Sequence, residues 1–216
     1  MSKNSKAKRD KKKAAVRSSG PKRLEFSSEK EVNRARAKLF DAKKLTTPAE
    51  INADLIQFST DHISSYDPFF ITSEPELWAR QSCCERNVLE YMKRNGGELV
   101  CGYKLWYNPP NYIEAERHAV WRKDGLYKDV SFSSDGEKMC LFVPDKDGAQ
   151  SALDANAPRI RWGKNQDTKD LIVLQEEIER LQRIERMDDQ TAWDTMLTYE
   201  QWLAGERMPN LIETKK

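Results

Sequence analysis

The 216-residue sequence lacks any long run of apolar residues, and a membrane-spanning helix needs about 18 of them or more. Its basic amino-terminal region also lacks the apolar stretch of a signal peptide. The chain has four cysteines, two of them adjacent, and this spacing does not resemble a disulfide framework. These absences predict an intracellular, cytoplasmic protein that does not enter a membrane.

Metal-binding patterns are also scarce. The chain has two histidines and no pair of cysteines separated by two residues, the spacing that most structural zinc sites use. A zinc site built from Cys83, Cys84, Cys101, Cys140 and His118 is a minor alternative, because adjacent cysteines seldom ligate the same ion. We therefore expect no metal and no cofactor.

Charge is distributed unevenly along the chain. The formal net charge is +2, yet residues 1–23 hold ten Lys or Arg and one acidic residue. No apolar periodicity occurs there, so residues 1–26 are predicted to be a disordered basic tail. Nucleic acid or another polyanion is the partner that such a tail would bind, although a solvated tail without a partner is an equally good interpretation. The densest basic cluster comprises Lys8, Arg9, Lys11, Lys12 and Lys13.

Changes in pattern divide the rest of the chain into four segments. We expect a helical segment over residues 27–80, an α+β core domain over 81–145, a linker over 146–166 and a helical segment over 167–216. In the first of these, one helix is predicted from Glu29 to Lys44. In the next helix, Thr47 is the expected N-cap, with Pro48 in the first turn and Glu50 completing a capping box.

The core domain shows the clearest signals. A helix is predicted from Cys84 to Arg94, and Gly96-Gly97 ends it because glycine tolerates the left-handed conformation that follows a helix. Alternating apolar residues and turn signals then predict four strands. The predicted strands are Leu99–Tyr107, Tyr112–Arg122, Leu126–Phe132 and Met139–Val143. The expected fold class is α+β, with a helix packed on a small antiparallel sheet.

The register of one hairpin brings two polar residues together. Asp124-Gly125 is a strong signal for a two-residue turn, since both positions of that turn need positive φ. Lys123 then pairs with Leu126, and counting back along both strands makes His118 and Asp129 diagonal neighbours on one face. A carboxylate in that position would orient the imidazole and stabilise its charged form. A loop longer by one residue would place His118 and Asp129 on opposite faces of the sheet.

Cys84 supplies a candidate nucleophile for this pair. The free N–H groups and the dipole at a helix start favour an anion, and Cys84 is predicted at such a start. Cys83 would take this position if the helix began one residue earlier. Glu114 and Glu116 share the face of His118 and are alternative orienting groups. A purely structural interpretation also stands, because free cysteines are often buried and strand histidines are often core residues.

The carboxy-terminal segment contains one strongly patterned helix, predicted from Asp170 to Met187, and a last short helix from Thr198 to Ala204. In the first of these helices, four apolar residues fall at heptad spacing: Leu171, Leu174, Ile178 and Leu181. Packing of this helix on the domain, or on the last helix, is favoured over dimerisation or partner binding, because two heptads are too few for a long coiled coil.

Several short motifs occur in an order that resembles a group of largely uncharacterised bacterial and phage proteins. They are Cys84-Glu-Arg-Asn87, Gly96-Gly97, Gly102-Tyr103-Lys104-Leu105-Trp106, Ile113-Glu-Ala-Glu-Arg-His118-Ala-Val-Trp121, Asp124-Gly125, Asp129-Val130-Ser131 and Leu141-Phe-Val-Pro-Asp145. That arrangement in turn is similar to the papain-like and transglutaminase-like thiol hydrolases. The resemblance covers under a third of the chain.

The resemblance implies roles for individual residues. Cys84 would be the nucleophile, His118 the base and Asp129 the orienting carboxylate. Asn87 favours Cys84 over Cys83, since it follows Cys84 at the spacing of the motif, and Gln81 occupies the region where papain-like enzymes place an oxyanion-hole glutamine.

Two functions follow from these observations. The first is a thiol hydrolase or acyltransferase that acts on an amide, isopeptide or ester bond of a protein or peptide-like substrate. The alternative is a non-enzymatic interaction protein that binds nucleic acid or another polyanion through its basic tail and a partner through its carboxy-terminal helix.

Overall fold

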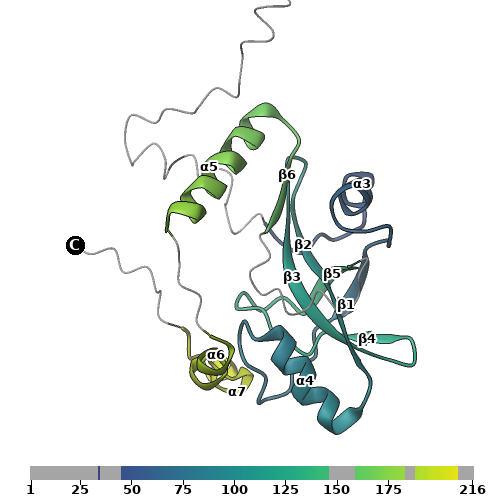
Figure 1. The fold of residues 1–216 in the computed structure, drawn as a ribbon, viewed down its shortest axis with the longest axis vertical. Coiled ribbons are helices and arrows are strands. Elements are labelled where there is room, and N and C mark those ends of the chain that lie inside the picture. The colour runs from purple at the N-terminus through teal and green to yellow at the C-terminus, as the bar shows by residue number, and fades with distance from the viewer. Residues whose placement is uncertain (1–33, 35–44, 146–158, 183–187, 209–216) are drawn as a thin grey trace, which may run out of the picture.

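A computed structural model describes residue 34 and residues 45–145, 159–182 and 188–208. These residues form a mixed α/β structure with a six-stranded antiparallel sheet and several helices (Figure 1). The predicted helix over 29–44 and the basic cluster of the tail lie outside the described residues, apart from Arg34, which is helical.

The sheet has the strand order β1-β5-β2-β3-β4, and β6 also pairs with β3. Its strands are β1 (Phe69–Thr72), β2 (Glu98–Asn108), β3 (Tyr112–Lys123), β4 (Leu126–Lys128), β5 (Met139–Pro144) and β6 (Ile160–Gly163). The long β2–β3 hairpin forms the centre, paired from Glu98 with Arg122 to Asn108 with Tyr112. On the other edge of β3, β6 pairs with residues 112–115 and β4 with residues 121–123. An interval between β4 and β6 therefore lies beside the middle of β3.

The predicted hairpin register is confirmed. Asp124 and Gly125 have φ values of 50° and 79°, and Lys123 pairs with Leu126. β4 is shorter than predicted, because the chain leaves β3 after Lys128. Asp129 instead forms a parallel bridge with Ser73, directly after β1.

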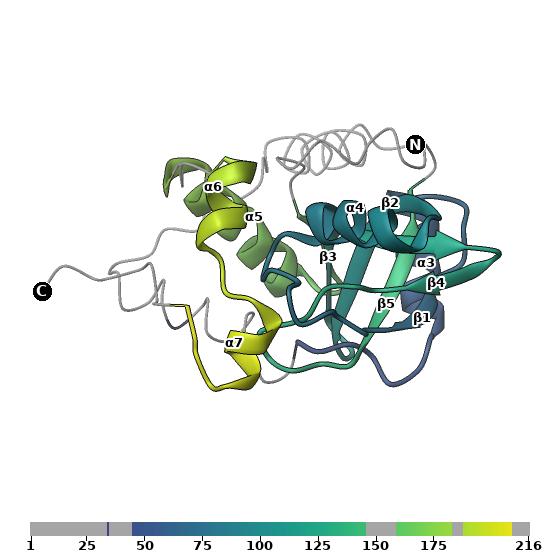
Figure 2. The same ribbon diagram turned by 90° about the horizontal axis from the view of Figure 1, so that it is seen from below.

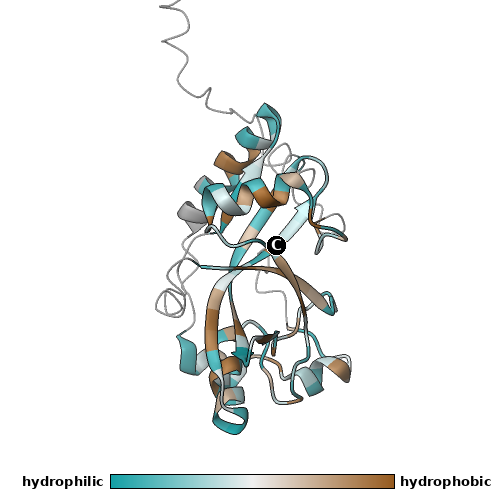
Figure 3. Cartoon of the chain, turned by 90° about the vertical axis from the view of Figure 1, so that its right-hand side faces the viewer, coloured by the Kyte–Doolittle hydropathy of each residue, from teal (hydrophilic) through white to brown (hydrophobic). Residues whose placement is uncertain are grey.

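Two helices cover apolar patches of the sheet. The helix α4 (Cys84–Asn95) places Val88 and Tyr91 on its buried side and ends at Gly96, where φ is 65°. The helix α3 (Ala53–His62) packs Leu55 and Phe58 over the far end of β2 and β3. Figure 2 shows α4 lying across the sheet, and Figure 3 shows hydrophobic residues along the strands with mixed polarity on the helices. Burial of these apolar faces is the main stabilising term.

The predicted N-cap at Thr47 is wrong. α3 begins after Asn52, whose side-chain oxygen accepts the N–H of Leu55 at 3.1 Å. Thr47 instead donates from its N–H and its hydroxyl to the carboxylate of Glu137, at 2.6 and 2.9 Å. A long-range acceptor thus replaces the local cap, and pattern analysis cannot detect such an acceptor.

The carboxy-terminal part contains three helices, α5 (Gln166–Gln182), α6 (Asp189–Thr195) and α7 (Tyr199–Leu203). α5 begins before the predicted Asp170, since Asn165 accepts the N–H of Thr168 at 2.8 Å. Among the α5 side chains that the structure describes, Thr168, Ile172 and Gln175 are buried, whereas Leu171 and Leu174 of the predicted leucine stripe are half-buried. None of the helices among the described residues has the length and apolarity to cross a membrane.

Candidate active site

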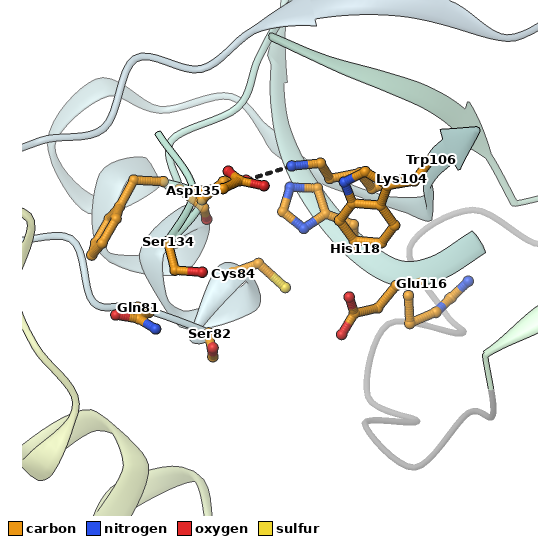
Figure 4. A pocket seen from close by; sticks show the side chains of 13 residues that line it. Gln81, Ser82, Cys84, Lys104, Trp106, Glu116, His118, Ser134 and Asp135 are labelled. Atoms are coloured by element: carbon orange, nitrogen blue, oxygen red, sulfur yellow. Dashed lines mark hydrogen bonds between the residues drawn. The ribbon is translucent and has the colours of Figure 1, made fainter. Parts of the chain in front are cut away.

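Cys84 is the first residue of α4, as predicted, and Cys83 is the N-cap without a side-chain hydrogen bond to the helix. N–H groups in a first turn have no acceptor within their helix, so they favour negative charge beside them. The Cys84 side chain lines a cavity of about 280 Å³. Figure 4 shows its sulfur and the imidazole of His118 facing the same space.

His118 comes from the middle of β3, beside the interval between β4 and β6, and is paired with Gly102 of β2. Its side chain is 13% exposed, and its Nε2 atom lies 3.1 Å from Oδ1 of Asp129. This contact is an ion pair whose angle falls outside hydrogen-bond geometry. Because Nε2 faces the carboxylate, Nδ1 is the ring nitrogen that remains to exchange a proton with Cys84.

Asp129 is held rigidly behind His118. The residue is 2% exposed, its Oδ1 accepts the N–H of Ser131 at 2.9 Å, and its Oδ2 accepts the hydroxyl of Ser73 at 3.0 Å. Burial raises the pKa of Asp129, but the charge and close contact of His118, together with the hydrogen bond from the Ser131 N–H, outweigh burial, so the net pKa lies below the ordinary value. Asp129 therefore remains a carboxylate at neutral pH.

The ionisation of His118 follows from its neighbours. Burial lowers its pKa, but the charge of Asp129 and the interaction with the Cys84 side chain together raise it to about 10. The imidazole is therefore protonated at neutral pH, and an imidazolium beside a thiol favours the thiolate. Sequence reasoning placed Cys84, His118 and Asp129 together, and the structure brings them together.

The other cysteines have different surroundings. Burial raises the pKa of Cys83 to about 11 and that of Cys101 to about 12. Cys140 is fully buried, and burial raises its pKa well above the ordinary value. High pKa values make these thiols poor nucleophiles, and Cys83 does not line the cavity. The geometry thus favours Cys84 over the rival Cys83.

The turn before α4 brings a further polar group to the cavity. Gln81 lines the cavity on the helix side (Figure 4), and its N–H donates to the carbonyl of Leu197 at 2.9 Å. The next residue, Ser82, has a φ of 58°, a left-handed conformation that costs energy for a residue other than glycine. This strained turn places the Gln81 side chain and the start of α4 on the same space.

Asn87 links the two halves of the site. It is fully buried in α4, and its carboxamide accepts from the N–H of Arg80 at 2.7 Å and donates to the carbonyl of Arg80 at 2.8 Å. It also donates to the hydroxyl of Ser131 at 3.2 Å. The amide thus ties the chain before Cys84 to the chain after Asp129. Sequence reasoning included Asn87 only through the motif.

Lys104 and Ser133 are among the cavity-lining residues that the sequence did not single out. Lys104 is 5% exposed, and its ammonium donates to the Ser133 hydroxyl at 2.5 Å and lies 3.6 Å from a Glu137 oxygen. Its charge is among the interactions that lower the pKa of Asp129, although burial of Asp129 acts in the opposite direction. Ser133 belongs to a serine-rich loop that forms one wall. A lysine among the apolar residues of a strand is the signal that marks Lys104 in the sequence.

The alternative orienting groups do not take the place of Asp129. Glu114 is bound by Arg159 at 2.9 Å and Arg161 at 3.2 Å. Glu116 lines the cavity, but it forms an ion pair with Arg159, at 3.2 Å. The second histidine, His62, packs its ring beside that of Phe58 on α3, outside the cavity.

Within the described ranges, no three His, Cys, Asp or Glu side chains are grouped so that they could hold a metal ion.

The chain matches no protein-family model, no curated protein and no solved structure. Function therefore has to be argued from the chemistry of the site.

Proposed function

We propose that this protein is a thiol hydrolase or acyltransferase acting on an amide, isopeptide or ester bond of a protein or peptide-like substrate. The supporting observation is the meeting of Cys84, at a helix start, with the His118–Asp129 ion pair on one cavity. Nucleophile, base and orienting group are the three parts that acyl transfer through a thiol needs.

The first half of the reaction forms a thioester. The Cys84 thiolate attacks the substrate carbonyl carbon, and the carbonyl electrons move to oxygen. First-turn N–H groups of α4 and the Gln81 carboxamide are the donors positioned to stabilise this oxyanion. As the tetrahedral intermediate collapses, protonated His118 gives its proton to the leaving amine or alkoxide.

The second half releases the acyl group. Neutral His118 now takes a proton from water, or from an acceptor amine, as that nucleophile attacks the thioester carbonyl. The carbon–sulfur bond breaks, the thiolate returns, and His118 is again protonated beside Asp129. Water as the nucleophile gives hydrolysis, and an amine gives acyl transfer.

The arrangement of the elements also supports a papain-like or transglutaminase-like core as part of this proposal. A cysteine opens a helix that packs on an antiparallel sheet, while the histidine lies on a strand and the carboxylate directly follows the next one.

The test is a burst experiment with p-nitrophenyl acetate, an activated ester. We expect release of about one nitrophenolate per protein in a fast phase, with the acetyl group located on Cys84 by mass spectrometry. Cys84→Ala should abolish the burst, and Cys83→Ser, the matched control, should retain it. Acetylation spread over lysines without a burst, or located on Cys83, would contradict the proposal.

We also propose polyanion binding by the basic tail, since ten of its first 23 residues are Lys or Arg. Affinity for a DNA duplex should fall steeply with salt and disappear when residues 1–23 are removed. Binding that is insensitive to salt, or that survives the truncation, would contradict this second function, which is independent of the first.

A further inference from the structure

Residues 196–202, here named the C-terminal strap, run beside the chain that leads into Cys84. Backbone hydrogen bonds join them: the N–H of Gln81 donates to Leu197 at 2.9 Å, and the N–H of Tyr199 donates to Ala79 at 2.8 Å. Arg80 and Thr198 form the antiparallel bridge between these bonds. Figures 1 and 2 both show α7 beside the loop that enters α4. The strap thus holds the helix-side wall of the cavity.

The same strap contacts the opposite wall. The rings of Tyr199 and Trp202 stack with centroids 5.9 Å apart, and both contact Phe132, at 5.1 and 5.8 Å. Phe132 lines the cavity and directly follows Ser131, whose N–H holds Asp129. The aromatic cluster therefore braces the loop on which the orienting carboxylate depends.

A third contact acts through Arg80. Its guanidinium donates to the carbonyl of Met196 at 2.9 Å, while Asn87 binds the backbone N–H and carbonyl of the same residue. By contrast, neither α6 nor α7 contributes a fully buried residue. The contacts of the strap are thus concentrated at the walls of the site and add little to the core.

We infer that the C-terminal strap sets the relative position of the two walls, with Tyr199 and Trp202 as positioning residues for Cys84 and for Asp129. This inference rests on the proposed function. If the strap loosens, Phe132 and Ser131 can shift, and Asp129 then holds His118 less firmly. The thiolate of Cys84 loses part of its electrostatic support, so its reactivity should fall even though Trp202 touches neither reacting group.

The test measures alkylation of each cysteine by iodoacetamide, using mass spectrometry, over a range of pH. Trp202→Ala should slow Cys84 alkylation near neutral pH by about tenfold or more, because small displacements in a site have large effects on rate. The midpoint of the pH dependence should move to higher pH. Leu203→Ala is the matched control: it lies on the same helix with 55% of its surface exposed, and it should leave the rate unchanged.

Other outcomes would overturn the inference. If Cys84 reacts fast in the native protein and equally fast in Trp202→Ala, the strap does not position it. If Cys101 and Cys140 become reactive together with a change at Cys84, Trp202 has a general structural role. Trp202→Leu keeps an apolar side chain without the stacking, and it supplies the same readout if Trp202→Ala does not fold. A slow Cys84 in the native protein would instead count against the proposed function itself.

Discussion

Strand β3 carries two buried clusters of charge only a few residues apart, and they have different surroundings. At Glu114, the carboxylate oxygens are bound by Arg159 and Arg161, and the Tyr112 hydroxyl also hydrogen-bonds to this carboxylate. At His118, the imidazole meets one carboxylate oxygen and faces a cavity that it shares with Cys84. The Glu114 cluster is enclosed by its arginines, and the His118 cluster opens on the cavity.

The difference shows that buried charge alone does not indicate a reactive site. Glu114 is 3% exposed and Asp129 is 2% exposed, so burial does not separate them. Glu114 does not line the cavity, and its charge is compensated by two guanidinium groups. The His118 cluster instead combines a cavity, the Cys84 thiol and an imidazole whose Nδ1 does not face Asp129, which are the features that the proposed chemistry requires.

The largest expected effect is on the ionisation of His118 when Asp129 is replaced by Asn. Without the carboxylate, the pKa of His118 should fall from about 10 toward or below the ordinary value of about 6.5. Titration of the imidazole by NMR measures this directly. Glu114→Gln is the control, and it should leave the His118 titration nearly unchanged; an unaltered pKa in Asp129→Asn would remove Asp129 from the site.

The same raised pKa gives stability a pH dependence. Because the folded protein holds the His118 proton more tightly, the stabilising effect is complete below about pH 6.5 and is lost as pH rises toward about 10. Urea unfolding of the native protein should therefore show declining stability over that window. Asp129→Asn should lack this decline, and a parallel decline in both proteins would show that the ion pair is not its cause.

The free energy of unfolding should fall most when the Glu114 cluster is disrupted. Glu114→Gln removes the buried carboxylate that Arg159 and Arg161 share and should lower the free energy of unfolding by about 3 kcal/mol. Glu116→Gln, on the same face but with a side chain 43% exposed, should change it by less than about 0.5 kcal/mol. Chemical denaturation measures both. Equal effects in the two variants would show that the Glu114 network is not energetically distinct.

Asn87→Ala should affect stability and reactivity together. The change removes three hydrogen bonds, two to the backbone of Arg80 and one to the buried Ser131 hydroxyl, at a cost of about 1–3 kcal/mol. Cys84 alkylation should also slow, since the chain before the nucleophile is no longer tied to the chain after Asp129. Lost stability with an unchanged alkylation rate would limit Asn87 to a structural role.

The smallest effect is expected for Cys83→Ser. Cys83 is outside the cavity, and its raised pKa of about 11 keeps it protonated. Stability should change by less than about 0.5 kcal/mol, and the alkylation rate of Cys84 should stay the same. A large loss of Cys84 reactivity in this variant would reopen the choice between the two cysteines.

Local signals in the sequence predicted the parts of the site that depend on short-range geometry. The two-residue turn at Asp124-Gly125 sets the pairing of the two strands, and this pairing puts His118 and Asp129 on the same face. The apolar spacing predicted a helix from Cys84 to Arg94 and the glycines predicted its end, while the choice between Cys83 and Cys84 as its start stayed open until the structure placed the start at Cys84. Turn geometry and helix periodicity are properties of a few neighbouring residues, so they can be read without the fold.

Contacts between distant segments could not be predicted in this way. Thr47 pairs with Glu137, and the strap reaches the chain before Cys84 from more than a hundred residues away. β1 and β6 are four residues each, too short for a clear alternation. The wall residue Lys104 and the linking role of Asn87 likewise depend on partners that only the folded chain brings near.

The most direct test is the rate at which iodoacetamide alkylates each cysteine, from about pH 5 to about pH 9, in the native protein and in His118→Ala. Cys84 should react fastest of the four cysteines, and His118→Ala should remove this advantage. If Cys84 is as slow as Cys101 and Cys140 at every pH, or equally fast without His118, the thiolate–imidazolium pair does not exist.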